Sequence, residues 1–206
     1  TMAYQLMMAR LAIKASLRIH FWILLVLVAT SWPLSCRGDL SQPGPFAAGS
    51  TTATITRSDS STLSALMYYP AITSGVDAPL DPTGCPYSAI TFGHGFLQQP
   101  ARYYGTLEHL ASYGHLVIAP TSEVGLFPNH LDFAIDMQLT LDYLTARHAD
   151  PADSLFGYVD INNFGLFGHS MGAGSGLLAA AHDKRIRAFA GLATAITNPS
   201  PEPLMP

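Results

Sequence analysis

The sequence predicts an α/β fold: a mixed, mostly parallel sheet with helices on both faces. Two alternating strands open the globular part, over residues 52–56 and 63–69, and a polar turn separates them. From residue 89 to 192, short apolar runs then alternate with helical stretches. Strands that alternate with helices build right-handed crossovers and therefore a parallel sheet. In such a sheet, ligands bind beyond the carboxyl ends of the strands.

The first crossover is predicted from two apolar runs and one helical stretch. Residues 89–92 read as a buried strand that ends in Gly93-His94-Gly95. Residues 101–113 suit a helix with Tyr103, Leu107 and Leu110 on one face, and Gly114 ends it. Residues 116–119 form the next strand candidate. Tyr103 and Tyr104 are candidates either for helix packing or for the lining of an apolar acyl pocket.

The longest predicted helix covers residues 130–148. Its predicted core face consists of apolar residues at helical spacing: Leu131, Ala134, Ile135, Leu139 and Leu141. The acids of this stretch are expected mostly outside that face: Asp132, Asp136 and Asp142. A strand over 163–167, a helix over 171–182 and a strand over 186–192 complete the pattern.

The first 38 residues read as a targeting segment. They contain no acid, carry Arg10, Lys14, Arg18 and Arg37, and include the apolar run IHFWILLVLVA. A basic region followed by a short apolar run is typical of a secretory signal, whereas a spanning helix needs about 20 apolar residues. We expect residues 1–37 to be a signal peptide or signal anchor, 38–50 a linker, and 51–206 the folded domain. Export is the main expectation, and anchoring in a membrane by residues 17–32 is the alternative.

Charge and composition limit the function classes. The chain is 49% hydrophobic and 12% charged, which is typical of a globular protein. Beyond residue 38 lie six of the ten Lys and Arg but all fourteen acids, leaving a net charge of −8. Such an acidic chain without a basic run is a poor nucleic-acid binder. Cys36 and Cys85 are too few for a disulfide scaffold or a zinc site, although an exported protein could pair them.

The stretch GLFGHSMGAGSG, residues 165–176, indicates a nucleophilic serine. Gly168-His169-Ser170-Met171-Gly172 fits the Gly-x-Ser-x-Gly motif, which carries weight only where a strand precedes it and a helix follows. Both conditions are met here, since FGLF precedes the motif and GSGLLAAAH follows it. Gly168 and Gly172 leave room at the tight turn, and Ser170 then lies at a helix N-terminus that favours negative charge. The competing interpretation is a glycine-rich turn that binds phosphate or nothing.

Gly93-His94-Gly95-Phe96 is the second candidate element of a site. A nucleophile elbow needs a second amide donor from the loop after an earlier strand. We expect the backbone N–H groups of Phe96 and Met171 to form the oxyanion hole. His169 is interpreted as structural, and five other histidines as helix-surface or cap residues: His109, His115, His130, His148 and His182. No pair of them has metal-ligand spacing, so no metal is expected.

These motifs, in this order, resemble the α/β-hydrolase superfamily and, within it, the cutinase, poly(ethylene terephthalate) hydrolase and chlorophyllase-like branch. Two segments carry the resemblance: AITFGHGFLQQPARYYGTLEHLASYGHLVIAP and YVDINNFGLFGHSMGAGSGLLAAAHDKRIRAFAGLATAITNPS. The resemblance implies an α/β-hydrolase fold, Ser170 as the nucleophile of an ester hydrolase, and no cofactor. It also implies a triad acid and histidine later in the chain.

No residue after Ser170 fits either of those two roles. Asp183 ends the helix after the serine, and Glu202 lies in a Pro-rich tail. The resemblance therefore implies a fold that is incomplete at the C-terminus, with 51–206 as its N-terminal two-thirds and the fragment alone inactive. Chlorophyllases place their acid near the end of the strand that holds Gly191, but residues 192–195 here are Leu-Ala-Thr-Ala. Polyester hydrolases of the cutinase-like subgroup often carry an aromatic clamp near Ala195, which is absent here. The expected substrate is therefore a small or medium ester of unspecified identity.

Two alternative functions remain open beside that of a serine ester hydrolase. One is a non-catalytic α/β-hydrolase-like binding or structural protein. The other is a different acyl-transfer or C–C-cleaving hydrolase, since a fold does not determine the chemistry of its site.

Overall fold

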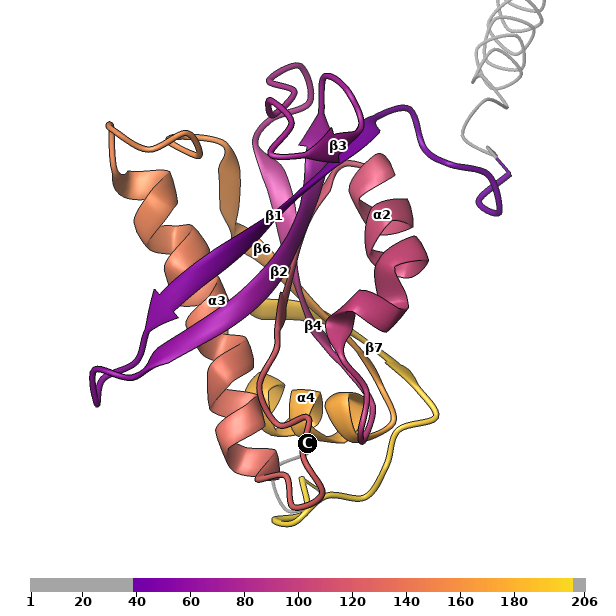
Figure 1. Ribbon diagram of the computed structural model, residues 1–206, viewed down its shortest axis with the longest axis vertical. Helices are drawn as coiled ribbons and strands as arrows, with labels where there is room; N and C mark the ends of the chain where they lie inside the picture. The colour runs from indigo at the N-terminus through magenta and orange to yellow at the C-terminus, as the bar shows by residue number, and fades with distance from the viewer. Residues whose placement is uncertain (1–38, 202–206) are drawn as a thin grey trace, which may run out of the picture. The chain divides into compact units, whose positions relative to one another are not determined.

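The computed structural model describes residues 39–201 (Figure 1). Contacts divide the chain into two units, Thr1–Gln42 and Pro43–Pro206, and all elements named below belong to the second. The predicted signal segment, Cys36 and Glu202 lie outside the described residues. Within residues 39–201, no helix combines the length and the apolar character needed to cross a membrane.

A seven-stranded mixed sheet forms the centre of the second unit. Its strands lie in the order β3-β1-β2-β5-β4-β6-β7. The β1–β2 and β2–β5 pairs are antiparallel, and the other pairs are parallel. This confirms the predicted mixed, mostly parallel sheet. The bounds of the strands are β1 Ala47–Thr56, β2 Thr62–Ala71, β3 Gly75–Val76, β4 Tyr87–Gly93, β5 His115–Pro120, β6 Val159–His169 and β7 Ile186–Leu192.

Helices cover both faces of the sheet, as predicted. A short 3-10 helix, η2 (Pro100–Tyr103), leads into α2 (Tyr104–Ser112), and the longer helices are α3 (His130–Ala149) and α4 (Met171–His182). Figure 1 shows α2 and α3 on opposite sides of the strands. Beneath α2, the buried residues Phe92, Leu107, Val117 and Ala119 form one cluster. On the other face, Phe133 and Met137 of α3 pack with Met171 and Leu178 of α4.

The core face of α3 differs from the predicted one. Its buried residues are Phe133, Ala134, Asp136, Met137, Thr140, Leu141 and Leu144. Leu131 and Ile135, predicted to face the core, are exposed, whereas Asp136, predicted mostly outside that face, is only 2% exposed. Ala134 and Leu141 are buried as predicted, so spacing was right for part of the face and wrong for Leu131, Ile135 and Asp136, because the helix has apolar residues on more than one side. The partners that make a buried Asp136 tolerable come from distant segments and are described below.

Of the strands that are longer than the sequence pattern indicated, β1 and β6 exceed it most. β1 begins at Ala47 and so includes the last residues of the predicted linker, because Ala47–Ser50 pair with Tyr68–Ala71 of β2. β6 begins at Val159, which pairs with Tyr87 of β4, and it contains a register shift before Phe164. Polar residues 160–163 concealed this first part of the strand from the apolar pattern.

The parallel strands bring three glycines to one edge of the sheet. Gly93 of β4 pairs with Gly168 of β6, and Gly168 pairs with Gly191 of β7. The loops that follow these strands, together with the loop after β5, therefore gather at the carboxyl edge, at the bottom of Figure 1. This is the edge at which the sequence predicts a ligand site.

Candidate active site

Ser170 is the single residue between β6 and α4. Its backbone has φ 51° and ψ −118°, a conformation that residues with a side chain rarely adopt and that costs about 1–3 kcal/mol. Three hydrogen bonds hold it there. The Ser170 N–H donates to Leu192 O at 2.8 Å, and Ser170 O accepts from Gly174 N at 3.0 Å and from Ala195 N at 3.1 Å. The strained turn is therefore braced by α4 and by the segment that ends β7.

Gly172 shows why the motif has glycine two residues after the serine. A Cβ at this position would lie 2.1 Å from Gly93 C and 2.5 Å from His94 O, both backbone atoms. Since no side chain can move aside to relieve such a contact, only glycine fits. Gly168 is similar, since its Cβ would lie 2.6 Å from Ala173 N. The first turn of α4 thus lies directly against the end of β4, where the second motif begins.

The N-terminus of α4 is open around the serine. Ser170 occupies the N-cap position, yet its side chain makes no capping hydrogen bond. The first amides of a helix have no partner within the helix, and the dipole of α4, 12 residues long, favours negative charge at this end. The Met171 N–H is the first of these amides. Its position suits a donor to an oxyanion formed at Ser170.

The loop after β4 fixes the peptide that carries the second predicted donor. The Gly95 N–H donates to the Tyr103 hydroxyl at 3.0 Å. Gly95 O accepts from Gln98 N at 3.0 Å and lies 2.9 Å from Nδ1 of His94. The Phe96 N–H has no hydrogen-bond partner within residues 39–201. An amide without a partner, next to a Gly95 whose N–H and C=O are both held, is available to a ligand.

Tyr103 connects this loop to the serine turn. Its hydroxyl oxygen lies 2.8 Å from Nδ1 of His169, the residue immediately before the serine. A phenol can accept the Gly95 N–H and donate to the imidazole at the same time. The Tyr103 ring also packs on Phe92, with ring centroids 4.9 Å apart. Of the two roles that the sequence left open for Tyr103, neither includes this bridge, which only the folded chain reveals.

His94 is fully buried and lies between two carbonyl groups. Its Nε2 lies 2.7 Å from Ser122 O, and its Nδ1 faces Gly95 O. Carbonyl oxygens only accept, so a neutral ring can donate to one of them and a doubly protonated ring to both. The ring also packs on Phe133 of α3, with centroids 4.6 Å apart. Sequence reasoning used His94 only as part of the His-Gly-Phe motif and missed these contacts.

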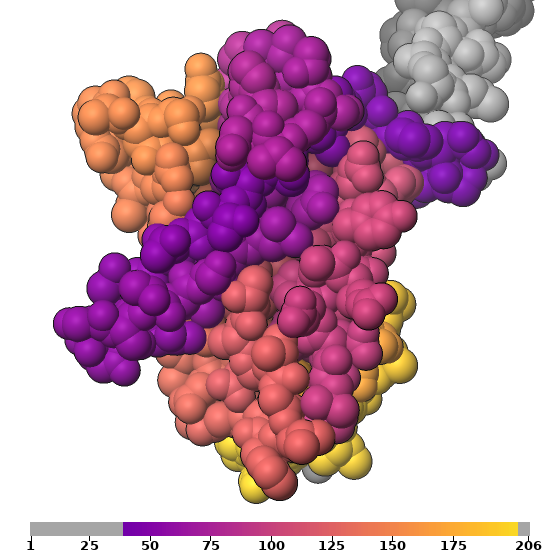
Figure 2. All heavy atoms as spheres, viewed as in Figure 1, coloured from indigo at the N-terminus to yellow at the C-terminus, as the bar shows by residue number. Residues whose placement is uncertain are grey.

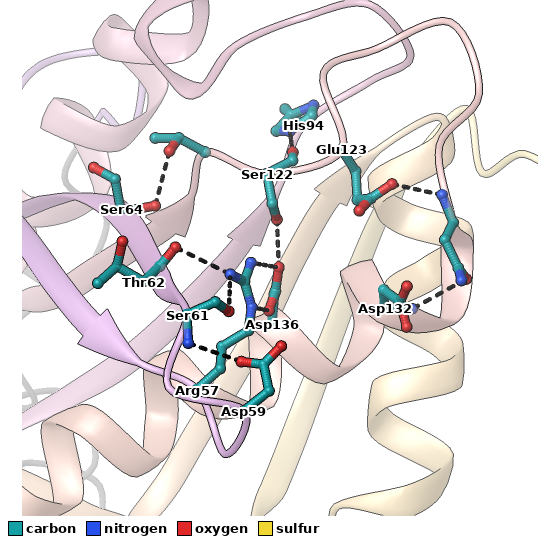
Figure 3. A network of polar contacts seen from close by, with 12 residues as sticks. Arg57, Asp59, Ser61, Thr62, Ser64, His94, Ser122, Glu123, Asp132 and Asp136 are labelled. Carbon is teal, nitrogen blue, oxygen red and sulfur yellow. Dashed lines mark hydrogen bonds and ion pairs between the residues drawn. The ribbon is translucent and has the colours of Figure 1, made fainter.

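An ion pair with a buried carboxylate and a partly buried arginine lies on the other side of Ser122 from His94 (Figure 3). Arg57, at the turn after β1, donates from Nε to Asp136 Oδ1 at 2.8 Å and from Nη2 to Oδ2 at 2.7 Å. The Ser122 hydroxyl donates to the same Oδ2 at 2.6 Å. The pKa of the Arg57 guanidinium is raised, chiefly by its hydrogen bonds to Asp136. One signal for this pair was present in the sequence, since Asp136 is three residues after Phe133 and adjacent to Met137.

None of the seven histidines within residues 39–201 hydrogen-bonds to the Ser170 hydroxyl. Apart from His94 and His169, the side chain of His130 accepts from Asn198 N and that of His148 from Val159 N. His182 lies at the far end of α4 from Ser170. In the same part of the chain, no cluster of three His, Cys, Asp or Glu side chains could hold a metal ion.

A contact between a serine hydroxyl and a histidine ring does occur, but away from this edge. Ser88 Oγ is 2.7 Å from His115 Nδ1, near the amino ends of β4 and β5. Burial lowers the pKa of His115. His115, predicted as a helix-surface or cap residue, is instead the first residue of a strand. Ser88 lies within β4, at a register shift against β6, without the strained turn or helix N-terminus of Ser170, so this pair lacks the features that activate a nucleophile.

The loops around the carboxyl edge expose apolar side chains. Phe127, in the loop after β5, is 96% exposed. That loop and the segment after β7 lie at the bottom of Figure 2, on the face shown. The other exposed apolar side chains of these loops are Phe96, Leu97, Val124, Leu126 and Ile196. A ligand approaching Ser170 from this side therefore meets a largely apolar rim.

The comparisons with known proteins agree with this geometry. A family model described as PET hydrolase-like matches residues 40–199, nearly all of the described chain. A search of curated proteins finds none that matches. The family match, the strand order and the helices on both faces confirm the expected α/β-hydrolase fold. The match also supports the cutinase and poly(ethylene terephthalate) hydrolase branch that the motifs resemble. The chain therefore belongs to the PET hydrolase-like family.

Proposed function

We propose that the protein is a serine-dependent carboxylic ester hydrolase with Ser170 as its nucleophile. Membership of the family implies an ester hydrolase and ester substrates. The serine mechanism rests on one observation above the others: the strained Ser170 backbone, with φ 51°, at the open N-terminus of α4. Strain of this kind persists only where the surroundings hold it, and it is concentrated at functional sites.

In the proposed reaction, Ser170 Oγ attacks the ester carbonyl carbon while a histidine takes its proton. The carbonyl oxygen becomes an oxyanion, which the N–H groups of Phe96 and Met171 bind. The C–O bond then breaks, and the alcohol leaves with the proton from the histidine. Water attacks the acyl-enzyme in the same way and releases the carboxylic acid, so Ser170 is regenerated.

The acid and the histidine of the triad are proposed to lie outside residues 39–201. The supporting observation is that none of the seven histidines within residues 39–201 hydrogen-bonds to the Ser170 hydroxyl. The 206-residue chain alone should consequently react slowly, because loss of triad members removes roughly 10³-fold or more of the rate. Phe96 and the exposed residues of the loop after β5 favour an ester with an apolar acyl or alcohol part.

The decisive experiment is labelling with a fluorophosphonate probe, read by intact mass and peptide mapping. The product of the complete gene is compared with the 206-residue chain. We expect the complete product to carry one adduct, on Ser170, and the shorter chain to react roughly 10³-fold more slowly. Hydrolysis of p-nitrophenyl esters of increasing chain length then measures how the apolar rim selects among substrates.

Two alanine variants make the labelling specific. Ser170→Ala should abolish the adduct, whereas Ser88→Ala, which removes the other serine next to a histidine, should leave it unchanged. Loss of the label in both variants, or a complete product that never labels, contradicts the proposal. A gene that ends at Pro206 would likewise leave the serine without a base and favour a non-catalytic binding protein.

We also propose that the protein is exported. The basic and apolar character of residues 1–37 supports this, and the segment lies outside the described residues. N-terminal sequencing of the protein from culture medium should find a chain that starts near residue 38. Recovery of the intact chain with the membrane fraction would instead favour the anchor at residues 17–32.

A further inference from the structure

The Phe96 N–H, the second donor of the proposed oxyanion hole, belongs to the same peptide unit as Gly95 C=O. That unit is planar, so whatever fixes the direction of the carbonyl also fixes the direction of the N–H on its opposite side. Two groups hold the carbonyl: Gln98 N at 3.0 Å and the ring of His94 at 2.9 Å. The aim of Phe96 N–H therefore depends on where the His94 ring is held.

The His94 ring is in turn held by Ser122, from the loop after β5. Ser122 O lies 2.7 Å from Nε2 of the ring; a neutral ring donates to one of its two carbonyl neighbours and only packs against the other, so both of them limit where the ring can lie. The same residue donates its hydroxyl to Asp136 of α3 at 2.6 Å. Ser122 thus bonds to the core with its side chain and to the oxyanion loop with its backbone. Figure 3 shows His94, Ser122 and Asp136 in this succession.

Asp136 is a firm attachment point for Ser122. Its side chain is 3% exposed, and Arg57 binds both of its oxygens. A buried carboxylate bonded in this way has little freedom to move, since every lost contact would leave a charge uncompensated. The rigidity of the pair is transmitted to the loop only if the Ser122 hydroxyl bond is intact.

We propose that Ser122 is a positioning residue of the oxyanion hole. It acts through His94 and Gly95 C=O to aim the Phe96 N–H, and the Arg57–Asp136 pair anchors it. The role rests on the proposed function, because it presupposes an oxyanion at Ser170. The Phe96 donor matters most where charge develops on the substrate oxygen, in the transition state. Loosening it should lower kcat and leave KM nearly unchanged.

The test replaces one hydroxyl. Ser122→Ala removes the bond to Asp136 and leaves the Arg57–Asp136 pair in place. In the complete gene product, with a p-nitrophenyl ester as substrate, we expect kcat to fall roughly 10- to 100-fold, as small misplacements of catalytic groups do. Ser122→Thr, which keeps a hydroxyl, should restore most of the rate.

Thr121→Ala is the matched control. Thr121 is the adjacent residue and also loses one hydroxyl bond, from its Oγ1 to Ser64 O at 2.9 Å, but the polar contacts of the His94 ring do not involve it. Its kcat should stay within about twofold of the wild-type value, as expected for a surface change. An equal fall in kcat for Thr121→Ala and Ser122→Ala would overturn the positioning role.

A second readout does not need activity. Amide hydrogen exchange of Gly95 and Gln98, followed by NMR in the complete gene product, reports directly on the loop, because both N–H groups are hydrogen-bonded. Ser122→Ala should speed exchange at these two amides about tenfold, equivalent to about 1.4 kcal/mol, with the β-sheet amides unchanged. Unchanged exchange at the two amides, or faster exchange throughout the chain, would overturn the proposal.

Measured together, kcat and amide exchange distinguish failure of the proposed esterase function from failure of the positioning role of Ser122. Faster local exchange in Ser122→Ala, combined with no esterase activity in the wild-type complete product, would refute the proposed function and keep the mechanical link. Normal activity in every variant, with unchanged local exchange, would refute the link and keep the esterase.

Discussion

Helix α3 carries two aspartates that pair with arginines, in very different surroundings. Asp136 is 3% exposed in its side chain and binds Arg57 through two hydrogen bonds. Asp142 is 54% exposed and shares Arg185 with Asp183. The first pair reaches the oxyanion loop through Ser122, whereas the second lies at the surface between α3 and the turn that follows α4.

The difference shows what a buried ion pair does here. Two charges withdrawn from water lose hydration, and their attraction compensates only where geometry and further hydrogen bonds are good. A surface pair loses little hydration and gains little, about 0–1 kcal/mol. The buried pair is therefore weak evidence for stability in itself. Because the pair lies beside Ser122 and His94, we infer that its role is to hold the oxyanion loop in place.

The largest effect is expected from removing one partner of the buried pair. Arg57→Met leaves Asp136 buried and unpaired, and we expect it to lower the free energy of unfolding by about 3–5 kcal/mol. Asp142→Asn, which removes the exposed acid of the surface pair and leaves Arg185 bonded to Asp183, should lower it by about 1 kcal/mol or less. Chemical denaturation of the two variants measures the contrast. Equal losses would mean that burial does not distinguish the pairs.

Replacing both charges of the Arg57–Asp136 pair tests whether the pair matters for the geometry of the oxyanion loop and not for stability. The double variant Arg57→Met with Asp136→Leu should recover most of the stability lost by Arg57→Met alone, within about 2 kcal/mol of wild type. Amide exchange at Gly95 and Gln98 should nonetheless be faster than in wild type, because the Ser122 hydroxyl no longer has Asp136 to bond to. Slow exchange in the double variant would show that apolar packing can anchor the loop as well.

A glycine substitution at the same edge should have the next largest effect. A Cβ on Gly172 would overlap backbone atoms of Gly93 and His94, so Gly172→Ala should destabilise by about 3 kcal/mol and separate the serine turn from the oxyanion loop. Gly105, in α2, has nothing within 4 Å of such a Cβ. Gly105→Ala should stabilise by about 0.5–1 kcal/mol. Thermal melts of both variants test this, and similar shifts would contradict it.

The smallest effect concerns pH at Asp183, a largely buried carboxylate that shares Arg185 with the exposed Asp142. Hydrogen bonds from Arg185 lower the pKa of Asp183 below its ordinary value of 3.8. A carboxyl whose pKa is lower in the folded chain stabilises it above the unfolded pKa and loses that contribution as pH falls through the folded pKa. Wild type should therefore lose about 1 kcal/mol more than Asp183→Asn between roughly pH 5 and pH 2. Parallel losses in urea titrations at those pH values would contradict this.

Much of the framework was predictable from local patterns. The hairpin, the crossovers and the helix after Ser170 follow from the alternation of apolar runs and helical spacing. The Gly-x-Ser-x-Gly motif also carries its own geometric requirement, since only glycine fits at Gly168 and Gly172. A prediction that no observation here tests concerns residues 1–37, which lie outside the described part of the chain.

The errors have a common cause. Spacing placed the core face of α3 on Leu131 and Ile135, which are exposed, and put Asp136 outside it. An aspartate is expected in the core only when its partners are known, and the partners Arg57 and Ser122 are 79 and 14 residues away in the sequence. Hydrophobic spacing can place an acid on a core face, as Phe133 and Met137 do for Asp136, but it contains no information about which distant residues pair with that acid.

By itself, the sequence determined the class of fold, the strand–turn–helix that presents Ser170 and the loop from which a second donor comes, because steric limits at glycines and the periodicity of strands and helices are local. Only the tertiary structure decided how that loop is held. The Tyr103 hydroxyl lies against His169, 66 residues away in the sequence. Ser122 donates its hydroxyl to Asp136, and its backbone carbonyl lies against His94. Directed hydrogen bonds and buried charges depend on which distant atoms meet in the folded chain, and that is settled by the packing of the whole sheet and its helices.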